Sequence, residues 1–183
     1  KMEEAIEGYR SVLKVHPDHA LALACLEQIY VEQGDWDALF ETYQQMAYAA
    51  LQDQQMAFCY RQMAFLSEWM QKQPSRAIEM WNRVLDIQGD AMDVMRALER
   101  LYAQVGRYEE VADVLRRMIL LAGTTASQLV LRYRLADVLS KKLHRAEEAL
   151  WVLQEITEIR PSHRKAWDRM LQLYRMGQQP FDL

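Results

Sequence analysis

The sequence repeats itself every 72 residues, and this period constrains the fold more than any other feature. Small, large apolar and helix-ending residues all recur at that spacing. The equivalent sets are Ala5, Ala77 and Ala149; Tyr9, Trp81 and Leu153; Val12, Val84 and Ile156; and Pro17, Gly89 and Pro161. A chain with such a period is a stack of similar units, each of which completes its core against its neighbours.

Each 72-residue period contains two amphipathic helix pairs. In the segment LYAQVGRYEEVADVL, residues 101–115, apolar residues at three- and four-residue spacing flank Gly106, which indicates two helices joined by a tight turn. The segment IYVEQGDWDALFETY, residues 29–43, has the same pattern around Gly34. Successive small-residue sites are separated by 34, 38, 34 and 38 residues, so short and long pairs alternate; these sites are Ala5, Leu39, Ala77, Val111 and Ala149.

The periodicity predicts ten helices along the chain. Their ranges are about 2–15, 19–33, 36–51, 55–71, 76–87, 91–104, 108–121, 128–141, 146–159 and 164–176. The residues expected to cap helix starts are Asp18, Asp90, Thr124 and Ser162, with Gln73 or Ser75 beside Pro74 in the long pair.

Composition agrees with an all-α chain. Of the 183 residues, 51% are apolar, while only 6 are Gly and 4 are Pro. Ala, Leu, Met, Glu, Gln and Arg are abundant, which favours helix over strand. No segment alternates with the period of two that a half-buried strand requires.

Charge and hydropathy disfavour two classes of partner. The net charge is −4 with the signs well mixed, whereas nucleic-acid-binding proteins usually carry a basic excess or stripe. No apolar run approaches the ~18–20 residues of a membrane span. Cys25 and Cys59 lie inside predicted helices, where free, partly buried thiols are expected.

No pattern typical of catalysis is present, so neither enzymatic activity nor a cofactor or metal is expected. The segment His16-Pro-Asp-His19 could hold a metal weakly, but all four histidines lie in or beside predicted loops, as solvated histidines do. There is no cysteine pair with zinc spacing, no glycine-rich phosphate loop and no nucleophile elbow.

A 34-residue helix-turn-helix period resembles the tetratricopeptide repeat (TPR). That family places apolar and aromatic residues in the first helix of each pair, alanine and an aromatic in the second, and proline at the end. The matching residues are Leu23, Leu26 and Tyr30, with Trp167, Met170 and Tyr174, for first helices; and Ala5, Tyr9 and Pro17, with Ala149, Leu153 and Pro161, for second helices.

The sequence departs from the family pattern at a few sites. The small residue of the first helix is Glu27, Glu99 or Leu171 in the short pairs, although Ala64 and Ala136 keep it in the long ones. Leu39 replaces an alanine of a second helix. These departures put helix spacing in doubt locally rather than the fold.

The resemblance implies one right-handed α-solenoid of stacked antiparallel helix pairs over residues 1–183. The chain begins at Lys1 within a helix, which indicates a piece of a longer array. The expected division is a lone second helix at 2–17, helix pairs at 18–53, 54–89, 90–124 and 125–161, and a first helix with a tail at 162–183.

In this family the first helix of each pair lines an inner groove, and the residues that the core does not use become candidates for binding a protein or peptide. The aromatic candidates lie in a long pair and arginines follow in the next. The candidate residues are Gln28, Phe58, Arg61, Phe65, Trp69, Asp93, Arg96, Arg100, Tyr133 and Asp137.

Two placements of the aromatic candidates remain open. In the groove, they would bind the apolar side chains of a partner, while Arg61, Arg96 and Arg100 would bind its acidic ones. Alternatively, the longer pair rotates its helix and buries Phe58, Phe65 and Trp69 between repeats. Some family members clamp a terminal carboxylate using Asn at fixed sites; because those sites are Gln28, Phe65, Arg100 and Asp137 here, the clamp is disfavoured.

The leading functional hypothesis is therefore a non-catalytic scaffold that binds a protein segment. One alternative is a structural spacer that associates through its ends or outer face, since helix faces around Tyr9 and Tyr174 would be uncovered. Another is a regulatory array attached to an enzyme or nucleic-acid-binding domain elsewhere in the protein. A cytoplasmic location is favoured, although the sequence does not name the compartment.

Overall fold

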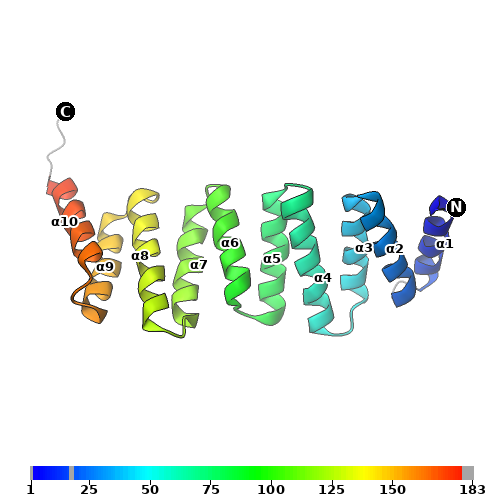
Figure 1. Cartoon of the computed structure of the whole chain (residues 1–183), viewed down its shortest axis with the longest axis horizontal. Coiled ribbons are helices and arrows are strands. Elements are labelled where there is room, and N and C mark those ends of the chain that lie inside the picture. The colour runs from blue at the N-terminus through cyan, green and yellow to red at the C-terminus, as the bar shows by residue number, and fades with distance from the viewer. Residues whose placement is uncertain (1, 17–18, 179–183) are drawn as a thin grey trace, which may run out of the picture. The chain divides into compact units, whose positions relative to one another are not determined.

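The computed structural model describes residues 2–16 and 19–178, and every regular element in these ranges is a helix (Figure 1). The helices are α1 (Met2–Val15), α2 (Ala20–Gln33), α3 (Trp36–Ala49), α4 (Asp53–Phe65), η1 (Leu66–Met70), α5 (Pro74–Gln88), α6 (Met92–Gln104), α7 (Tyr108–Leu121), α8 (Thr125–Lys141), α9 (Ala146–Ile159) and α10 (Arg164–Gln178). The helices expected from the sequence are confirmed, with ends that differ by a few residues at most.

The chain forms two compact units, which we call the N-terminal unit (Lys1–Leu101) and the C-terminal unit (Tyr102–Leu183). Within each unit, helices that follow one another in sequence pack together. The N-terminal unit contains the contacts α1–α2, α2–α3, α3–α4 and α4–α5, and the C-terminal unit contains α7–α8, α8–α9 and α9–α10. The predicted all-α architecture of consecutive helix pairs is confirmed in both units.

The repeated small and apolar residues form the core of each unit. Ala77, Ala149 and Leu153 are fully buried, and Ala64 and Ala136 are buried in the first helices of the two long pairs. Small side chains at these positions let neighbouring helices approach closely, and large ones fill the space between them. The sequence period therefore marks core positions.

Glycine ends the first helix of both short pairs in the same way. Gly34 and Gly106 have φ angles of 68° and 79°, the left-handed conformation that glycine adopts without steric cost. The amides of the following residues, Asp35 and Arg107, donate to the carbonyls of Tyr30 and Tyr102 at 3.0 and 2.9 Å. These bonds close the helix ends and turn the chain towards the second helix.

Several predicted helix caps differ from the structure. Pro17 and Asp18 lie outside the described residues, and it is His19 whose Nδ1 accepts from the Ala22 amide at 3.2 Å. The prediction of Ser162 is wrong, because His163 Nδ1 makes the equivalent bond to Ala166 at 3.2 Å. Two histidines expected to be merely solvated therefore cap helices.

Of two further predicted caps, one makes the expected hydrogen bond and the other does not. The prediction at Thr124 is confirmed by a 3.2 Å bond to its side chain from the Ser127 amide. Gln73 stands at the N-cap position of α5, but its side chain makes no capping bond. Pro74 occupies the first turn of that helix, where a missing amide costs nothing.

The acidic residue at one predicted small-residue position has a specific partner. The Tyr43 hydroxyl donates to the Glu27 carboxylate at 2.5 Å, which joins α2 to α3. Burial and this hydrogen bond both raise the pKa of Tyr43 above its ordinary value. The pair explains how a glutamate is accommodated at the α2–α3 interface.

The first long pair contains an irregularity that the sequence did not predict. The helix expected at 55–71 changes to a π-helix over Leu66–Met70, in which the Gln71 amide donates to the Leu66 carbonyl five residues earlier at 2.9 Å. The helix ends at Met70, and Lys72, two residues later, has a φ of 53°. Single π-turns of this kind occur mostly inside α-helices and often at functional sites.

Two regions have less apolar burial than the sequence indicated. Val12 was expected on the apolar face of α1 but is exposed, while the adjacent Leu13 is buried. On α10, Trp167 and Tyr174 are about half-exposed, whereas Met170 is buried. Residues 179–183 of the tail lie outside the described residues.

Candidate functional site

Three aromatic residues form a line on the surface of the N-terminal unit, and we call them the aromatic stripe: Phe58, Phe65 and Trp69. Phe65 and Trp69 lie seven and eleven residues after Phe58 along α4 and η1, a spacing that keeps side chains on one side of a helix. Their exposed fractions are 49%, 54% and 54%. The described structure therefore leaves these rings half-exposed rather than buried between helices.

The π-turn contributes to the position of the last aromatic residue. Trp69 lies within η1, and its ring centroid is 6.1 Å from that of Phe65 at an angle of 40°. A tilted pair of this kind is a favourable arrangement of two aromatic rings. The stripe thus ends in two rings in contact.

An ion pair joins α4 to α6 at one level of the stripe. Arg61 donates from one guanidinium nitrogen to Asp93 at 2.6 Å and from another to Gln88 at 3.1 Å. Its guanidinium also lies 5.9 Å from the ring centre of Trp81. Burial alone would raise the pKa of the Asp93 carboxyl, but the hydrogen bond and charge of Arg61 lower it below its ordinary value.

A second ion pair joins η1 to α6 at the other end of the stripe. Arg100 donates to the Glu68 carboxylate, whose side chain is only 8% exposed. The hydrogen bond to Glu68 raises the pKa of Arg100 above its ordinary value, so this guanidinium is charged at any physiological pH. The same guanidinium lies 5.6 Å from the ring centre of Trp69, at cation–π distance.

These contacts change the expectation for the three arginines. Arg61 and Arg100 already pair with carboxylates of the chain itself, those of Asp93 and Glu68. Arg96, in contrast, is exposed on α6 between Asp93 and Arg100. Arg96 lies one turn from Asp93 and one turn from Arg100, so it stands at the level of Phe65. Among the three, Arg96 is the residue whose charge is most available to a partner.

The remaining candidates make contacts of their own. Gln28 on α2 is exposed and bonds to Glu32 at 3.2 Å. Tyr133 and Asp137 belong to α8 of the C-terminal unit, where the Tyr133 ring lies 6.1 Å from that of His163. Asp137 is paired with Lys141 at 2.9 Å and lies 3.6 Å from Arg169. Contacts in the structure join Arg61 to Asp93, and Trp69 to both Phe65 and Arg100, while Phe58 and Arg96 are exposed on the same helices.

Sequence reasoning missed the role of Glu68, although a signal was available. Arg61–Asp93 and Glu68–Arg100 both span 32 residues, so two oppositely charged pairs recur at one separation. In a chain of stacked helix pairs, equal separations of this kind indicate side chains on equivalent helices of neighbouring pairs.

The described part of the chain shows neither of two other kinds of site. It contains no group of three or more His, Cys, Asp or Glu side chains placed to hold a metal ion. It also has no helix with the length and hydropathy needed to cross a membrane.

Comparison with known proteins supports the repeated helix-pair architecture. The family model of the tetratricopeptide repeat matches residues 22–57 and 94–129, two segments offset by the 72-residue period. No curated protein matches the chain.

Solved structures share the fold at low sequence identity. YrrB, described as a TPR protein with an unusual peptide-binding site, is 14% identical with a TM-score of 0.53, over 94% of this chain and 85% of that one. MamA is 16% identical with a TM-score of 0.51, over 84% and 79%. The MamA structure designated AMB-1 is 19% identical with a TM-score of 0.51, over 92% and 85%. Two segments of the chain thus match the tetratricopeptide repeat, and the chain shares its fold with these solved structures.

Proposed function

We propose that this protein is a non-catalytic scaffold that binds a segment of another protein on the face of α4, η1 and α6. The observation that carries the proposal is the aromatic stripe, three half-exposed rings in one line. Exposed apolar surface of this kind commonly marks a partner site. The tetratricopeptide repeat match supports a protein-interaction scaffold in general terms.

The charges beside the stripe specify the partner further. Arg96 offers an exposed cation at the level of Phe65, whereas Arg61 and Arg100 are engaged with Asp93 and Glu68. A partner that presents apolar side chains to the rings and one acidic side chain to Arg96 complements this face. The two internal ion pairs then serve to hold the face in shape.

The proposal is tested with peptides selected from a displayed library of random 12-residue sequences. Selected peptides are synthesised, and calorimetry measures their Kd for the wild type and for variants. Trp69→Ala removes the largest ring of the stripe, so we expect binding to be weaker by at least about 30-fold. Arg96→Glu is expected to weaken the binding of peptides that contain an acidic residue.

The matched control lies in the other long pair. Lys141 is the residue 72 positions after Trp69 and is also exposed, so Lys141→Ala should leave the Kd unchanged. If the selected peptides bind the double variant Phe65→Ala/Trp69→Ala as tightly as the wild type, the proposed face is wrong.

A second candidate role is assembly through α10, which the exposed Trp167, Leu171 and Tyr174 favour. Sedimentation measured over a range of concentrations tests it. Self-association that Leu171→Glu abolishes would support this role, and a monomer at every concentration would exclude it.

A further inference from the structure

A pocket of about 550 Å³ lies beside the aromatic stripe in the N-terminal unit. It is bounded by the start of α2, the end of α3, the connection that follows α3 and the start of α4, and Figure 1 shows these helix ends around the α3–α4 connection. Its volume is within the ~300–1,000 Å³ range of protein ligand pockets.

The walls of this pocket are mainly apolar. Leu23, Met46, Ala49, Phe58 and Cys59 contribute to them. Burial raises the pKa of the Cys59 thiol to about 11, with the negative charge of Glu27 adding to the effect, so the thiol is uncharged at neutral pH. Among the residues that the structure describes, no lysine, arginine, aspartate or glutamate lines the pocket.

A charged occupant would therefore lose its hydration without gaining an ionic partner, which is costly. An uncharged apolar group would lose only unfavourable contact with water. Three exposed glutamines, Gln52, Gln54 and Gln55, stand around the pocket, and their amides can donate to and accept from a peptide backbone.

Phe58 belongs both to the pocket wall and to the aromatic stripe, so the two features are continuous. We propose that the pocket receives one large uncharged apolar side chain, of the leucine, methionine or phenylalanine class, from the partner segment that lies on the stripe. This inference rests on the proposed function, whose partner it specifies by an anchor residue.

Charge along the face also gives the partner a direction. The described residues that line the pocket, at the start of α4, offer no ionic group, while Arg96 stands at the level of Phe65, seven residues after Phe58. Seven helical residues span about 10 Å, so at least three residues of extended chain separate the apolar anchor from an acidic residue at Arg96.

Capped single amino acids test the pocket without requiring the rest of the partner. N-acetyl-phenylalaninamide and N-acetyl-leucinamide are titrated into protein labelled at the methionine methyl groups, and the Met46 resonance, assigned with Met46→Leu, is followed by NMR. We expect a saturable shift with Kd on the order of millimolar. N-acetyl-glutamate amide should cause no saturable shift.

Filling the pocket provides the decisive variant. Ala50 lines the pocket in an extended conformation just after α3. A phenylalanine there would fill the pocket, so Ala50→Phe should weaken the binding of both apolar probes at least about tenfold. Ala24→Phe, an exposed site on α2 outside the pocket, is the matched control and should bind as the wild type does. If Ala50→Phe does not fold, as judged by circular dichroism, Ala20→Phe at the exposed start of α2 replaces it.

The outcomes separate this inference from the proposed function. Absence of a Met46 shift with either apolar probe, or equal binding by the filled variant, overturns the pocket assignment even if selected peptides bind the stripe. The double variant Phe65→Ala/Trp69→Ala should retain probe binding while losing peptide binding. If the apolar probes bind but no selected peptide depends on the aromatic stripe, the result supports the pocket and counts against the proposed partner-binding face of α4, η1 and α6.

Discussion

The two long helix pairs share a core but differ on the surface. Met63 and Ala64 in α4 are buried, as are Leu135 and Ala136 at the equivalent positions of α8. The stripe positions of α4 correspond, 72 residues later, to Val130, Asp137 and Lys141. The repeat therefore retains what packs the helices and varies what faces outwards.

The pairs differ in helix type at the end of the first helix, where η1 covers Leu66–Met70 but α8 continues to Lys141. The closing bond is the same in both: the Gln71 amide donates to the Leu66 carbonyl at 2.9 Å, and the Leu143 amide donates to that of Val138 at 3.1 Å. Ser67 is buried in the π-turn at the position where α8 has Leu139, also buried. The two helix ends thus close in the same way and keep the position buried, although one side chain is polar and the other apolar.

The largest expected effect tests whether the two cores are equivalent. Met63→Ala and Leu135→Ala each remove a large buried side chain and leave a cavity, so each should lower the free energy of unfolding by about 2–5 kcal/mol. Chemical denaturation of the two variants measures both losses. A loss below about 1 kcal/mol in only one variant would show that the shared core is not equally packed.

A smaller effect should distinguish the two helix ends. The Ser67 hydroxyl is buried and has no hydrogen-bond partner among the described residues, so Ser67→Ala should raise the free energy of unfolding by about 1 kcal/mol. Ser140 in α8 donates to the Ala136 carbonyl at 2.8 Å and accepts from Arg169 at 3.0 Å. Ser140→Ala should therefore destabilise by about 1 kcal/mol. Equal signs in the two variants would contradict the comparison.

The pH dependence of stability should reflect the buried thiol of α4. The pKa of Cys59 rises from an ordinary 9.0 to about 11 on folding. Between these values the folded state holds more protons than the unfolded state, so stability is fully present below pH 9 and falls as the pH rises towards 11. Cys59→Ala should make this fall shallower in denaturation curves across that window. If the free energy of unfolding of Cys59→Ala falls as steeply with pH as that of the wild type, the raised pKa of Cys59 is not the cause.

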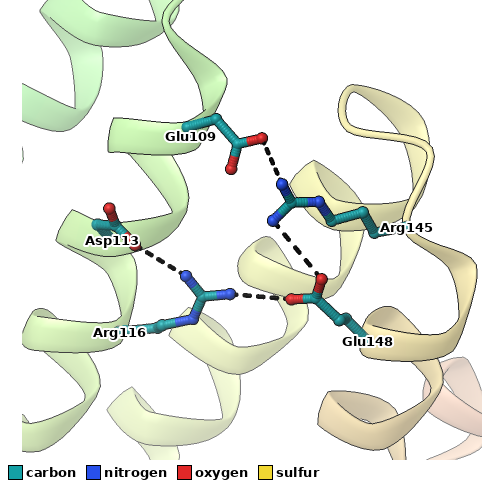
Figure 2. A network of polar contacts seen from close by, with 5 residues as sticks. All are labelled: Glu109, Asp113, Arg116, Arg145 and Glu148. Atoms are coloured by element: carbon teal, nitrogen blue, oxygen red, sulfur yellow. Dashed lines mark hydrogen bonds and ion pairs between the residues drawn. The ribbon is translucent and has the colours of Figure 1, made fainter.

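The smallest effect concerns a surface network of the C-terminal unit (Figure 2). Arg145 pairs with Glu109 at 2.7 Å and Glu148 at 3.5 Å, and Arg116 pairs with Glu148 at 3.2 Å and Asp113 at 2.8 Å. Because these groups are largely exposed, Arg145→Ala should cost about 0.2–1 kcal/mol, and less at high salt. A loss that does not diminish with salt would indicate packing rather than charge.

The period predicted the helices and their cores because alanine and leucine positions repeat in sequence as they do in space. It did not predict the π-turn, since no local pattern around Ser67 marks a change of hydrogen bonding. It identified Phe58, Phe65 and Trp69 as candidates by elimination, but not their exposure, which depends on the rotation of α4. The helix caps at His19 and His163 were missed although they are 144 residues apart, twice the period.

The most direct test of the central claim is a two-dimensional NMR spectrum of the tryptophan indole groups during titration with a selected 12-residue peptide. Trp69 lies on the aromatic stripe and is 54% exposed, while Trp151 on α9 belongs to the C-terminal unit and is 72% exposed. The proposed face predicts that the Trp69 indole signal shifts to saturation while that of Trp151 stays in place. A shift of Trp151 with no change at Trp69 would contradict it.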